Sequence, residues 1–261
     1  MTNKVYLVGA GPGAPDLLTL RAARLLEQAD IVFFDALVHL DTVALAANAR
    51  KVAVGKRAGE VSTDQRFINR QLVEAARHYR HVVRLKGGDP MIFGRAQEEI
   101  DALKEAGIAC EVVPGITAAL AASASLGRSL TRRGVARTVS FATPRIGPNE
   151  TESDWLTCAA AADSTILYMA AGQAPQIAAA LVAAGKSSGT PVAIVENASL
   201  ESEQIFFSTL AGVTVSRLAL AGPTLLCVGA VFAAEAACGP DANVEPHSRM
   251  RELHASRCQA R

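Results

Sequence analysis

The chain has 261 residues, half of them hydrophobic, and a formal net charge of +1. This length and apolar content suit one large or two medium globular domains and argue against disorder across the body of the chain. A charge so close to zero argues against a nucleic-acid surface, although it leaves room for a local basic pocket that binds an acidic small molecule.

The cysteines and the amino terminus indicate the cellular setting. The five cysteines are scattered, with no Cys-x-x-Cys pair and no histidine at ligand spacing, which predicts a reducing compartment and no metal site. Residues 1–4 run straight into an apolar run without a signal peptide, and no apolar segment approaches the length that spans a bilayer. We therefore expect a cytoplasmic protein with no membrane partner.

Apolar runs alternate with helical patterns in the first part of the chain. The expected strands are residues 4–8, 31–34, 51–54, 82–85 and 110–113. This alternation predicts a parallel α/β domain. Between the third and fourth strands, Ser62 and Gln65 form a predicted capping box, and the helix that follows is expected to carry on one face Phe67, Ile68, Leu72, Ala75, Ala76 and Tyr79.

Two glycine-bearing turns, at residues 9–14 and 86–90, each follow an expected strand. Glycine at a strand end lets a ligand approach backbone N–H groups that a Cβ would shield. The first turn, GAGPGA, is close to the dinucleotide fingerprint G-x-G-x-x-G, but Ala14 stands in place of the third glycine. Pro12 and Pro15 also delay the next helix to about residues 16–19, so the turn is expected to be an irregular loop.

Pro114 and Gly115 end this first set of elements. A second set of strands is expected at residues 138–142, 165–169, 192–195, 205–208 and 225–228, which predicts a second α/β domain. The sequence thus predicts an N-terminal domain over residues 1–114, a C-terminal domain over residues 115–236 and a flexible tail over residues 237–261.

Several segments, taken in order, resemble the tetrapyrrole methylase family from residue 5 to about residue 231. They are VYLVGAGPGAPDLLTL, VGKRAG, RLKGGDPMIFGRAQEE, VVPGITAA, LTRRG, LYMA and PVAIVENAS. The resemblance implies the tetrapyrrole methylase fold, in which two α/β domains have the cofactor cleft between them, and a homodimer. It also implies S-adenosyl-L-methionine as methyl donor, S-adenosyl-L-homocysteine as product, and no metal.

The members that the chain most resembles methylate uroporphyrinogen III twice to give precorrin-2, which leads to sirohaem, cobalamin or haem d1. The resemblance therefore implies a small-molecule tetrapyrrole substrate. Because the chain has no amino-terminal extension that would oxidise precorrin-2 or insert iron, those later steps are expected to need partner proteins.

The resemblance also marks a donor pocket. It places Gly87, Gly88 and Asp89 along the amino-acid and ribose part of the donor, and it completes the pocket with Pro12, Ile92, Thr117, Ala118, Met169 and Ala198. Taken alone, the two glycines would be an ordinary tight turn and Met169 a core side chain.

Methylation of a pyrrole carbon also requires the loss of a proton, and the resemblance marks Asp35 and Lys56 as candidate acid–base groups. Arg95 is a further candidate near the macrocycle, with Glu98 as its orienting partner, although an unperturbed arginine is a poor base. The substrate carries many carboxylates, which guanidinium groups bind through two hydrogen bonds, so Arg95 and Arg133 are the expected substrate ligands.

Other interpretations remain open at this point. One is a methylase of the same fold that acts on a later corrin precursor, and another is an NAD-dependent oxidoreductase, which rests on GAGPGA and on Asp35 after the second strand. A third is a non-catalytic tetrapyrrole-binding protein, against which the retained Asp35, Lys56 and Arg95 argue. Substrate geometry is less defined than donor binding, because the chain departs from the usual family spelling at Ala36, Arg132 and residues 143–145. Ala198 replaces a glycine of the family beside the expected donor pocket, where its methyl group is expected to narrow the space around the adenine.

Overall fold

The computed structural model describes residues 4–55, 64–147, 153–216 and 220–234. The contacts divide the chain into two compact units, Met1–Ala121 (unit 1) and Ala122–Arg261 (unit 2). The sequence-based domain boundary after residue 114 stays a prediction, and the predicted tail over residues 237–261 lies outside the described residues. In the part of the chain that the structure describes, no helix is long and apolar enough to cross a membrane.

Unit 1 contains a five-stranded sheet in the order β3-β2-β4-β1-β5. Every pairing in it is parallel. Its strands are β1 (Lys4–Gly9), β2 (Ile31–Phe34), β3 (Arg50–Ala53), β4 (His81–Lys86) and β5 (Ala109–Val113). The parallel α/β prediction for this part of the chain is therefore confirmed. Because the strands are parallel, the carboxyl ends of all five lie at the same edge of the sheet.

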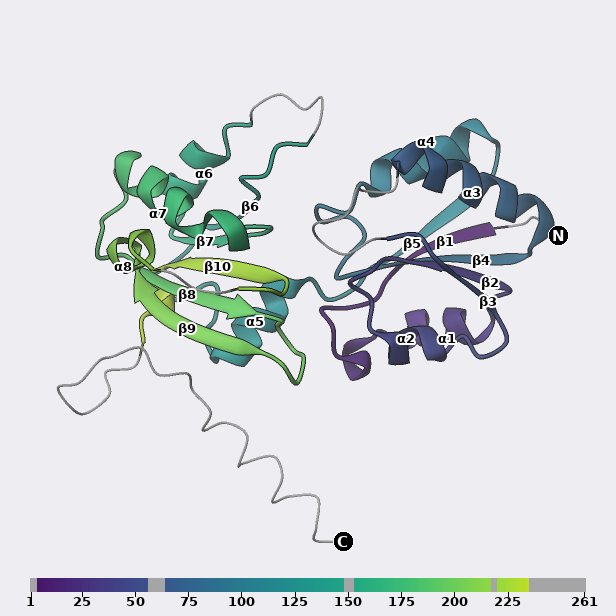
Figure 1. Cartoon of the computed structure of the whole chain (residues 1–261), viewed down its shortest axis with the longest axis horizontal. Helices are drawn as coiled ribbons and strands as arrows, with labels where there is room; N and C mark the ends of the chain where they lie inside the picture. The colour runs from purple at the N-terminus through teal and green to yellow at the C-terminus, as the bar shows by residue number, and fades with distance from the viewer. Residues whose placement is uncertain (1–3, 56–63, 148–152, 217–219, 235–261) are drawn as a thin grey trace, which may run out of the picture. The chain divides into compact units, whose positions relative to one another are not determined.

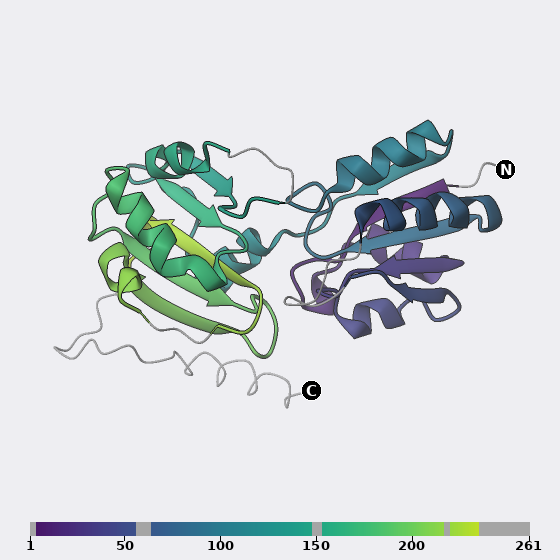
Figure 2. The ribbon, with the colours of Figure 1, turned by 45° about the horizontal axis from the view of Figure 1, so that its top comes forward.

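Helices cover both faces of this sheet (Figures 1 and 2). One face carries α1 (Leu20–Glu27) and α2 (Leu40–Ala44), and the other carries α3 (Gln65–His78) and α4 (Ala96–Glu105). Because neighbouring strand residues point to opposite faces, Val83 packs with α1 and α2 whereas Val82 packs with α3 and α4. Two apolar cores result, one on each side of the sheet.

The start of α1 follows the sequence prediction. A short 3-10 turn, η1 (Pro15–Leu17), comes first, and Thr19 then caps α1 by accepting a hydrogen bond from the backbone N–H of Ala22 at 3.2 Å. The two prolines postpone the helix, so the first glycine turn is an irregular loop. A dinucleotide fingerprint requires an α-helix that begins directly after the turn. Here the first α-helix begins only at Leu20.

The start of α3 differs from the prediction. Its N-cap is Asp64, whose carboxylate accepts a hydrogen bond from the backbone N–H of Arg66 at 2.9 Å, and Ser62 lies outside the described residues. Gln65 is therefore the first residue of the helix and not the third residue of a capping box, and its side chain donates to the Glu99 carboxylate at 3.1 Å. The predicted buried face was also wrong at Phe67, which is 45% exposed, because Gln65 takes the inward position near the start of the helix.

Unit 2 contains a mixed sheet in the order β6-β7-β10-β8-β9. Its strands are β6 (Val139–Ala142), β7 (Ser164–Leu167), β8 (Pro191–Glu196), β9 (Gln204–Thr209) and β10 (Thr224–Gly229). Only β6 and β7 pair in parallel, and β10 is antiparallel to both of its neighbours. Its helices are α6 (Trp155–Ala161), α7 (Ala174–Ala183) and α8 (Leu210–Thr214), with the short turns η2 (Ala171–Gln173) and η3 (Ala230–Phe232).

The predicted second α/β domain is confirmed, and α5 (Ala118–Leu126) contains the division between the two units. One strand end is corrected. The strand expected at residues 165–169 stops at Leu167, because Met169 has a positive φ of 56° that a strand does not allow.

The cysteines that the structure describes differ in their burial. Burial raises the pKa of the Cys227 thiol to about 12, whereas Cys158 is exposed. Because Cys227 stays protonated at pH 8 and is shielded by burial, we expect iodoacetamide to modify it at least about 100-fold more slowly than the exposed Cys158. Peptide mapping by mass spectrometry measures both rates, and equal rates in the folded protein would contradict the buried position of β10.

The raised thiol pKa values also give a direction for alkaline stability. Burial raises the pKa of Cys110 to about 11, and the unfolded thiols titrate near 9.0. Above pH 9.0 the unfolded chain therefore loses thiol protons that the folded chain keeps, so these two groups lower the stability as pH rises toward 11 and 12.

Candidate functional site

Three loops that follow neighbouring strands are joined at the carboxyl edge of unit 1. Gly11, after β1, and Gly88, after β4, form an isolated antiparallel bridge in which each backbone N–H donates to the other residue's carbonyl, at 3.2 and 2.7 Å. The N–H of Ala10 also donates to the carbonyl of Lys86 at 2.7 Å. The two glycine turns found in the sequence are thus one structural feature.

The third loop follows β5 and packs against the other two without side chains between them. A Cβ on Gly115 would lie 2.8 Å from the Cα of Gly9 and closer still to the carbonyl oxygen of Gly88. Real Cβ atoms do not approach backbone this closely, so glycine is required at these contacts. The missing Cβ of Gly88 faces Thr117 and Ala118 at 3.8 and 3.9 Å.

Asp89 ties these loops together through its side chain. Its Oδ2 accepts a hydrogen bond from the N–H of Gly115 at 2.9 Å, and its Oδ1 accepts one from the N–H of Met91 at 2.8 Å. The carboxylate therefore fixes both the course of its own loop and the distance to the loop after β5. The structure accordingly brings together, at one edge of unit 1, the predicted donor residues Pro12, Gly87, Gly88, Asp89, Ile92, Thr117 and Ala118.

This edge fits a ligand that is bound mainly through backbone groups. Gly87 and Gly88 are partly exposed, and among the described residues the missing Cβ of Gly87 meets only the Cβ of Leu37, at 3.4 Å. The backbone beside Gly87 is therefore accessible to close approach, whereas the N–H and carbonyl of Gly88 are engaged in the bridge to Gly11. Among the residues that the structure describes, no group of three or more His, Cys, Asp or Glu side chains could hold a metal ion.

Arg95 and Glu98 form the ion pair that the sequence predicted. The guanidinium donates two hydrogen bonds to the carboxylate, from Nε at 2.7 Å and from Nη2 at 2.8 Å. Arg95 lies at the N-cap of α4 with φ 54°, and both side chains are about half exposed. Such an exposed pair adds little stability, but its two-point contact fixes where the guanidinium lies.

Asp35 follows β2 on the α3 and α4 side of the same edge. Its Oδ1 accepts a hydrogen bond from Nη2 of Arg84 at 2.6 Å, and its side chain is 29% exposed. A Cβ on Gly55 would touch the backbone of Asp35 and Ala36, so the chain after β3 passes directly beside Asp35. Lys56, the next residue, lies outside the described residues.

The sequence analysis missed a buried group of charges beneath this edge. Glu99 of α4 is fully buried and accepts hydrogen bonds from Nε of Arg84 at 3.0 Å and from Nζ of Lys86 at 3.2 Å. The side chains of Arg84 and Lys86 are 2% and 4% exposed. A signal was present in the sequence, because two charges that alternate with Val83 and Leu85 in a buried parallel strand must find partners.

The buried charges shift one another's titration. Burial alone lowers the pKa of Arg84, but the charges of Asp35 and Glu99 outweigh burial and hold this pKa above its ordinary value. Burial and the charge of Arg84 hold the pKa of Lys86 below its ordinary value, despite its ion pair with Glu99. Glu99 is therefore the carboxylate that makes two buried cations tolerable.

Two further predicted donor residues lie in unit 2, each directly after a strand. Met169 follows β7 and Ala198 follows β8, and since both strands pair antiparallel with β10 they end at the same edge of the sheet. Met169 is 45% exposed, so the interpretation of Met169 as a core side chain is wrong, whereas Ala198 is 6% exposed. Glu203 holds the loop after β8 by accepting a hydrogen bond from the N–H of Ser199 at 2.7 Å.

Backbone strain in the described chain gathers at these loops. The non-glycine residues with positive φ are Phe93, Arg95, Met169, Asn197 and Ser199. Arg95 and Met169 are predicted site residues, and the other three each lie next to one in the sequence. Such conformations cost free energy and persist where the surrounding structure holds them, which is common at functional sites.

Arg133, the predicted substrate ligand, lies in an exposed tight turn of unit 2. Backbone hydrogen bonds between Arg132 and Ala136, at 2.9 and 2.8 Å, close the turn, and Gly134 has φ 77°. Arg133 is exposed beside this glycine. The turn therefore leaves its guanidinium accessible to an anion.

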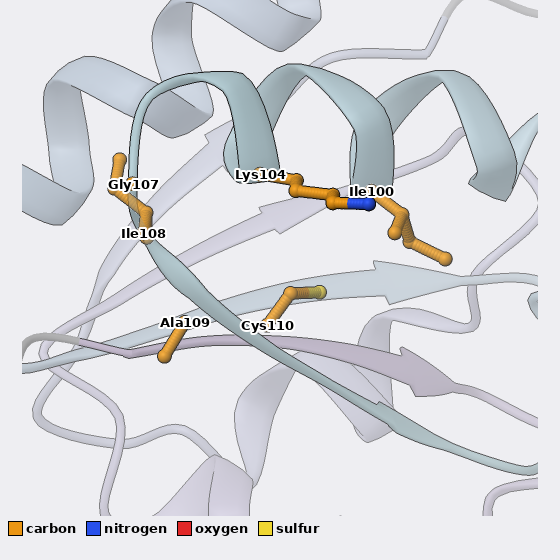
Figure 3. A pocket seen from close by; sticks show the side chains of 6 residues that line it. All are labelled: Ile100, Lys104, Gly107, Ile108, Ala109 and Cys110. Carbon is orange, nitrogen blue, oxygen red and sulfur yellow. The ribbon is translucent and has the colours of Figure 1, made fainter.

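A surface depression of about 460 Å³ lies elsewhere on unit 1, between α4 and the beginning of β5. Figure 3 shows the Cys110 side chain pointing toward α4 and Lys104 lying along the helix near Ile100. Its volume is in the range of ligand pockets. However, Ala109 and Cys110 begin β5, so the depression lies at the opposite end of the strand from the joined loops.

Comparisons with known proteins agree with this geometry. The family described as Tetrapyrrole (Corrin/Porphyrin) Methylases matches residues 4–214. The siroheme synthases of Psychrobacter sp. (strain PRwf-1) and Pseudomonas putida (strain F1) are each 44% identical to the chain over 232 residues, which is 88% of the chain. These residues are 48% and 50% of the two relatives, so the chain spans about half the length of the curated relatives it matches.

Two solved structures are also similar over most of the chain. The uroporphyrin-III C-methyl transferase from Thermus thermophilus, complexed with S-adenyl homocysteine, is 39% identical with a TM-score of 0.78, over 88% of this chain and 98% of that chain. A cobalt precorrin-4 methyltransferase is 27% identical with a TM-score of 0.75, over 88% and 96% of the two chains.

Proposed function

The chain belongs to the tetrapyrrole methylase family, and on this premise we propose that it is an S-adenosyl-L-methionine-dependent C-methyltransferase that methylates uroporphyrinogen III twice to give precorrin-2. The observation that carries the proposal is the similarity along almost the whole length of the Thermus thermophilus transferase. The family match also favours this function over the NAD-dependent oxidoreductase.

The joined loops of unit 1 are the proposed place for the donor. The bridge between Gly11 and Gly88 and the Asp89 contact to Gly115 support this assignment, because they hold the glycine-bearing loops together at strand carboxyl ends, where ligands bind in open α/β sheets. When bound, the donor supplies an electrophilic methyl group. The contributions of Met169 and Ala198, and a donor cleft between the two domains, stay predictions.

The chain's own task is then to hold the tetrapyrrole and to accept the proton that it loses. Asp35 is the proposed proton acceptor, supported by its partly exposed carboxylate beside the loop of Gly87 and Gly88, and Lys56 is proposed to assist it. Arg95, oriented by Glu98, and Arg133 are proposed to bind carboxylates of the substrate, since a guanidinium is a poor base but a strong anion ligand.

The setting of the enzyme follows from the same proposal. We propose a cytoplasmic homodimer whose product enters sirohaem, cobalamin or haem d1 synthesis. The similarity to siroheme synthases supports the first of these pathways.

The test is a methyl-transfer assay with the purified protein. Fresh uroporphyrinogen III and S-adenosyl-L-methionine should give a dimethylated product that absorbs as sirohydrochlorin after oxidation, with two S-adenosyl-L-homocysteine molecules per tetrapyrrole. Calorimetry should detect binding of S-adenosyl-L-homocysteine and none of NAD. Failure to methylate uroporphyrinogen III, together with methylation of a later corrin precursor, would assign the chain to the alternative methylase.

A further inference from the structure

Arg84 connects a buried helix to the exposed edge where Asp35 lies. Its Nε donates to Glu99 of α4 at 3.0 Å, and its Nη2 donates to Asp35 after β2 at 2.6 Å. Its Nη1 donates to the carbonyl of Leu85 at 3.2 Å. Three nitrogens of one planar group are therefore held by three different acceptors, which leaves the guanidinium a single orientation.

The sheet places these groups together for a simple reason. Strand β2 pairs in parallel with β4, and Phe33 lies opposite Arg84. Asp35 and Lys86 lie two positions further along their strands, so all of these side chains point to the face that α3 and α4 cover. Glu99 projects from α4 onto this face and is held in turn by Gln65 of α3, whose Nε2 donates to its Oε1 at 3.1 Å.

Stability alone is a weak reason to keep such an arrangement. An arginine with 2% exposure requires desolvation that an apolar side chain would avoid, and well-packed apolar replacements of buried ion pairs are often as stable or more so. What the arginine adds is a fixed position for Asp35. Arg84 donates a hydrogen bond to Oδ1 of Asp35 alone, and among the described residues Oδ2 of Asp35 has no hydrogen-bond partner.

We propose that Arg84 is a positioning residue that holds the Asp35 carboxylate in place for the tetrapyrrole, and that Glu99 holds Arg84. This inference rests on the proposed function and assigns a role to residues that do not touch the substrate. Asp35 keeps one oxygen on Arg84 and presents the other to the substrate. A displaced carboxylate would still be present but would lie at the wrong distance from the proton it accepts.

The variant Arg84→Lys tests this role. Lysine keeps a cation for Glu99, but its single nitrogen cannot contact Glu99 and Asp35 from two sides as the fork does. We expect kcat to fall about 100-fold, as for other small misplacements of a reacting group. Calorimetry should give an affinity for S-adenosyl-L-homocysteine within about twofold of wild type, because the donor loops stay joined.

A double-mutant cycle separates positioning from a general loss of structure. If Arg84 acts through Asp35, Arg84→Lys should change kcat less than about threefold when Asp35 is already alanine. Arg80→Lys is the matched control, because Arg80 is exposed just before β4, and it should leave kcat unchanged. Thermal unfolding checks that each variant folds, and Arg84→Gln takes the place of Arg84→Lys if the latter does not.

The possible results distinguish the proposed function from the positioning role of Arg84. A wild-type protein that methylates no tetrapyrrole removes the proposed function and this role with it. If the wild type is active, then an unchanged kcat in Arg84→Lys, or additive losses in the cycle, overturns the positioning role alone. A parallel loss of donor binding also overturns it, because it would show that the substitution disturbs the whole edge.

Discussion

Replacing Glu99 with leucine is expected to lower the free energy of unfolding by about 3–5 kcal/mol, because removing one partner of a buried ion pair leaves an uncompensated charge. Here two cations are affected, since Arg84 and Lys86 both contact this carboxylate and are almost fully buried. Native domains are stable by only about 5–15 kcal/mol, so the loss is a large fraction of the total. Urea unfolding followed by circular dichroism measures it.

The matched control lies on the same helix. Asp101 of α4 is exposed and accepts a hydrogen bond from Nε2 of Gln97 at 2.8 Å. Asp101→Leu should change the free energy of unfolding by no more than about 0.5 kcal/mol. If the two variants unfold at the same urea concentration, the buried charge group does not stabilise unit 1 as its contacts indicate.

Replacing Gly115 with alanine is expected to separate the joined loops of unit 1. The new methyl group would overlap the carbonyl oxygen of Gly88 and lie 2.8 Å from the Cα of Gly9, so backbone must move. Overpacking of this kind costs about 1–3 kcal/mol of stability. If the donor binds at these loops, its affinity should fall at least about tenfold, which corresponds to about 1.4 kcal/mol.

Gly172→Ala provides the control for this substitution. A Cβ on Gly172 would meet no atom of the described residues within 4 Å, and its φ is not in the left-handed region, so neither stability nor binding should change measurably. Calorimetry with S-adenosyl-L-homocysteine and thermal unfolding give the two readouts. Wild-type affinity in a folded Gly115→Ala protein would place the donor away from the joined loops.

The strands were predictable because each is a local pattern. In unit 1 every expected strand was found within one residue at each end, from the apolar runs alone. The delayed start of α1 was predictable as well, since the effect of proline is confined to its own neighbourhood. The start of α3 was not, because Gln65 takes part in a contact with Glu99, 34 residues away, instead of a local cap.

The candidate site was predictable only in part. The glycine turns and the pair of Arg95 with Glu98 are close in sequence or resemble a known pattern, and the structure joins the two turns and pairs Arg95 with Glu98. Arg84, Lys86 and Glu99 were not predicted, because their pairing depends on how α4 packs against β4 and not on a local pattern. The charged residues Arg84 and Lys86 in the buried strand β4 indicate that each needs a partner, but they do not indicate which residue that partner is.

By itself the sequence determined the alternation of strands and helices, the positions of the glycine loops and the family. Periodicity and turn chemistry act over a few residues, so they can be read locally. Only the tertiary structure decided which loops meet and which charges pair. The strand order puts β2 beside β4, and this brings Arg84 to Asp35 across 49 residues of chain. A sequence pattern reports that a side chain is buried, whereas its partner is chosen by sheet order and helix packing, which are properties of the whole fold.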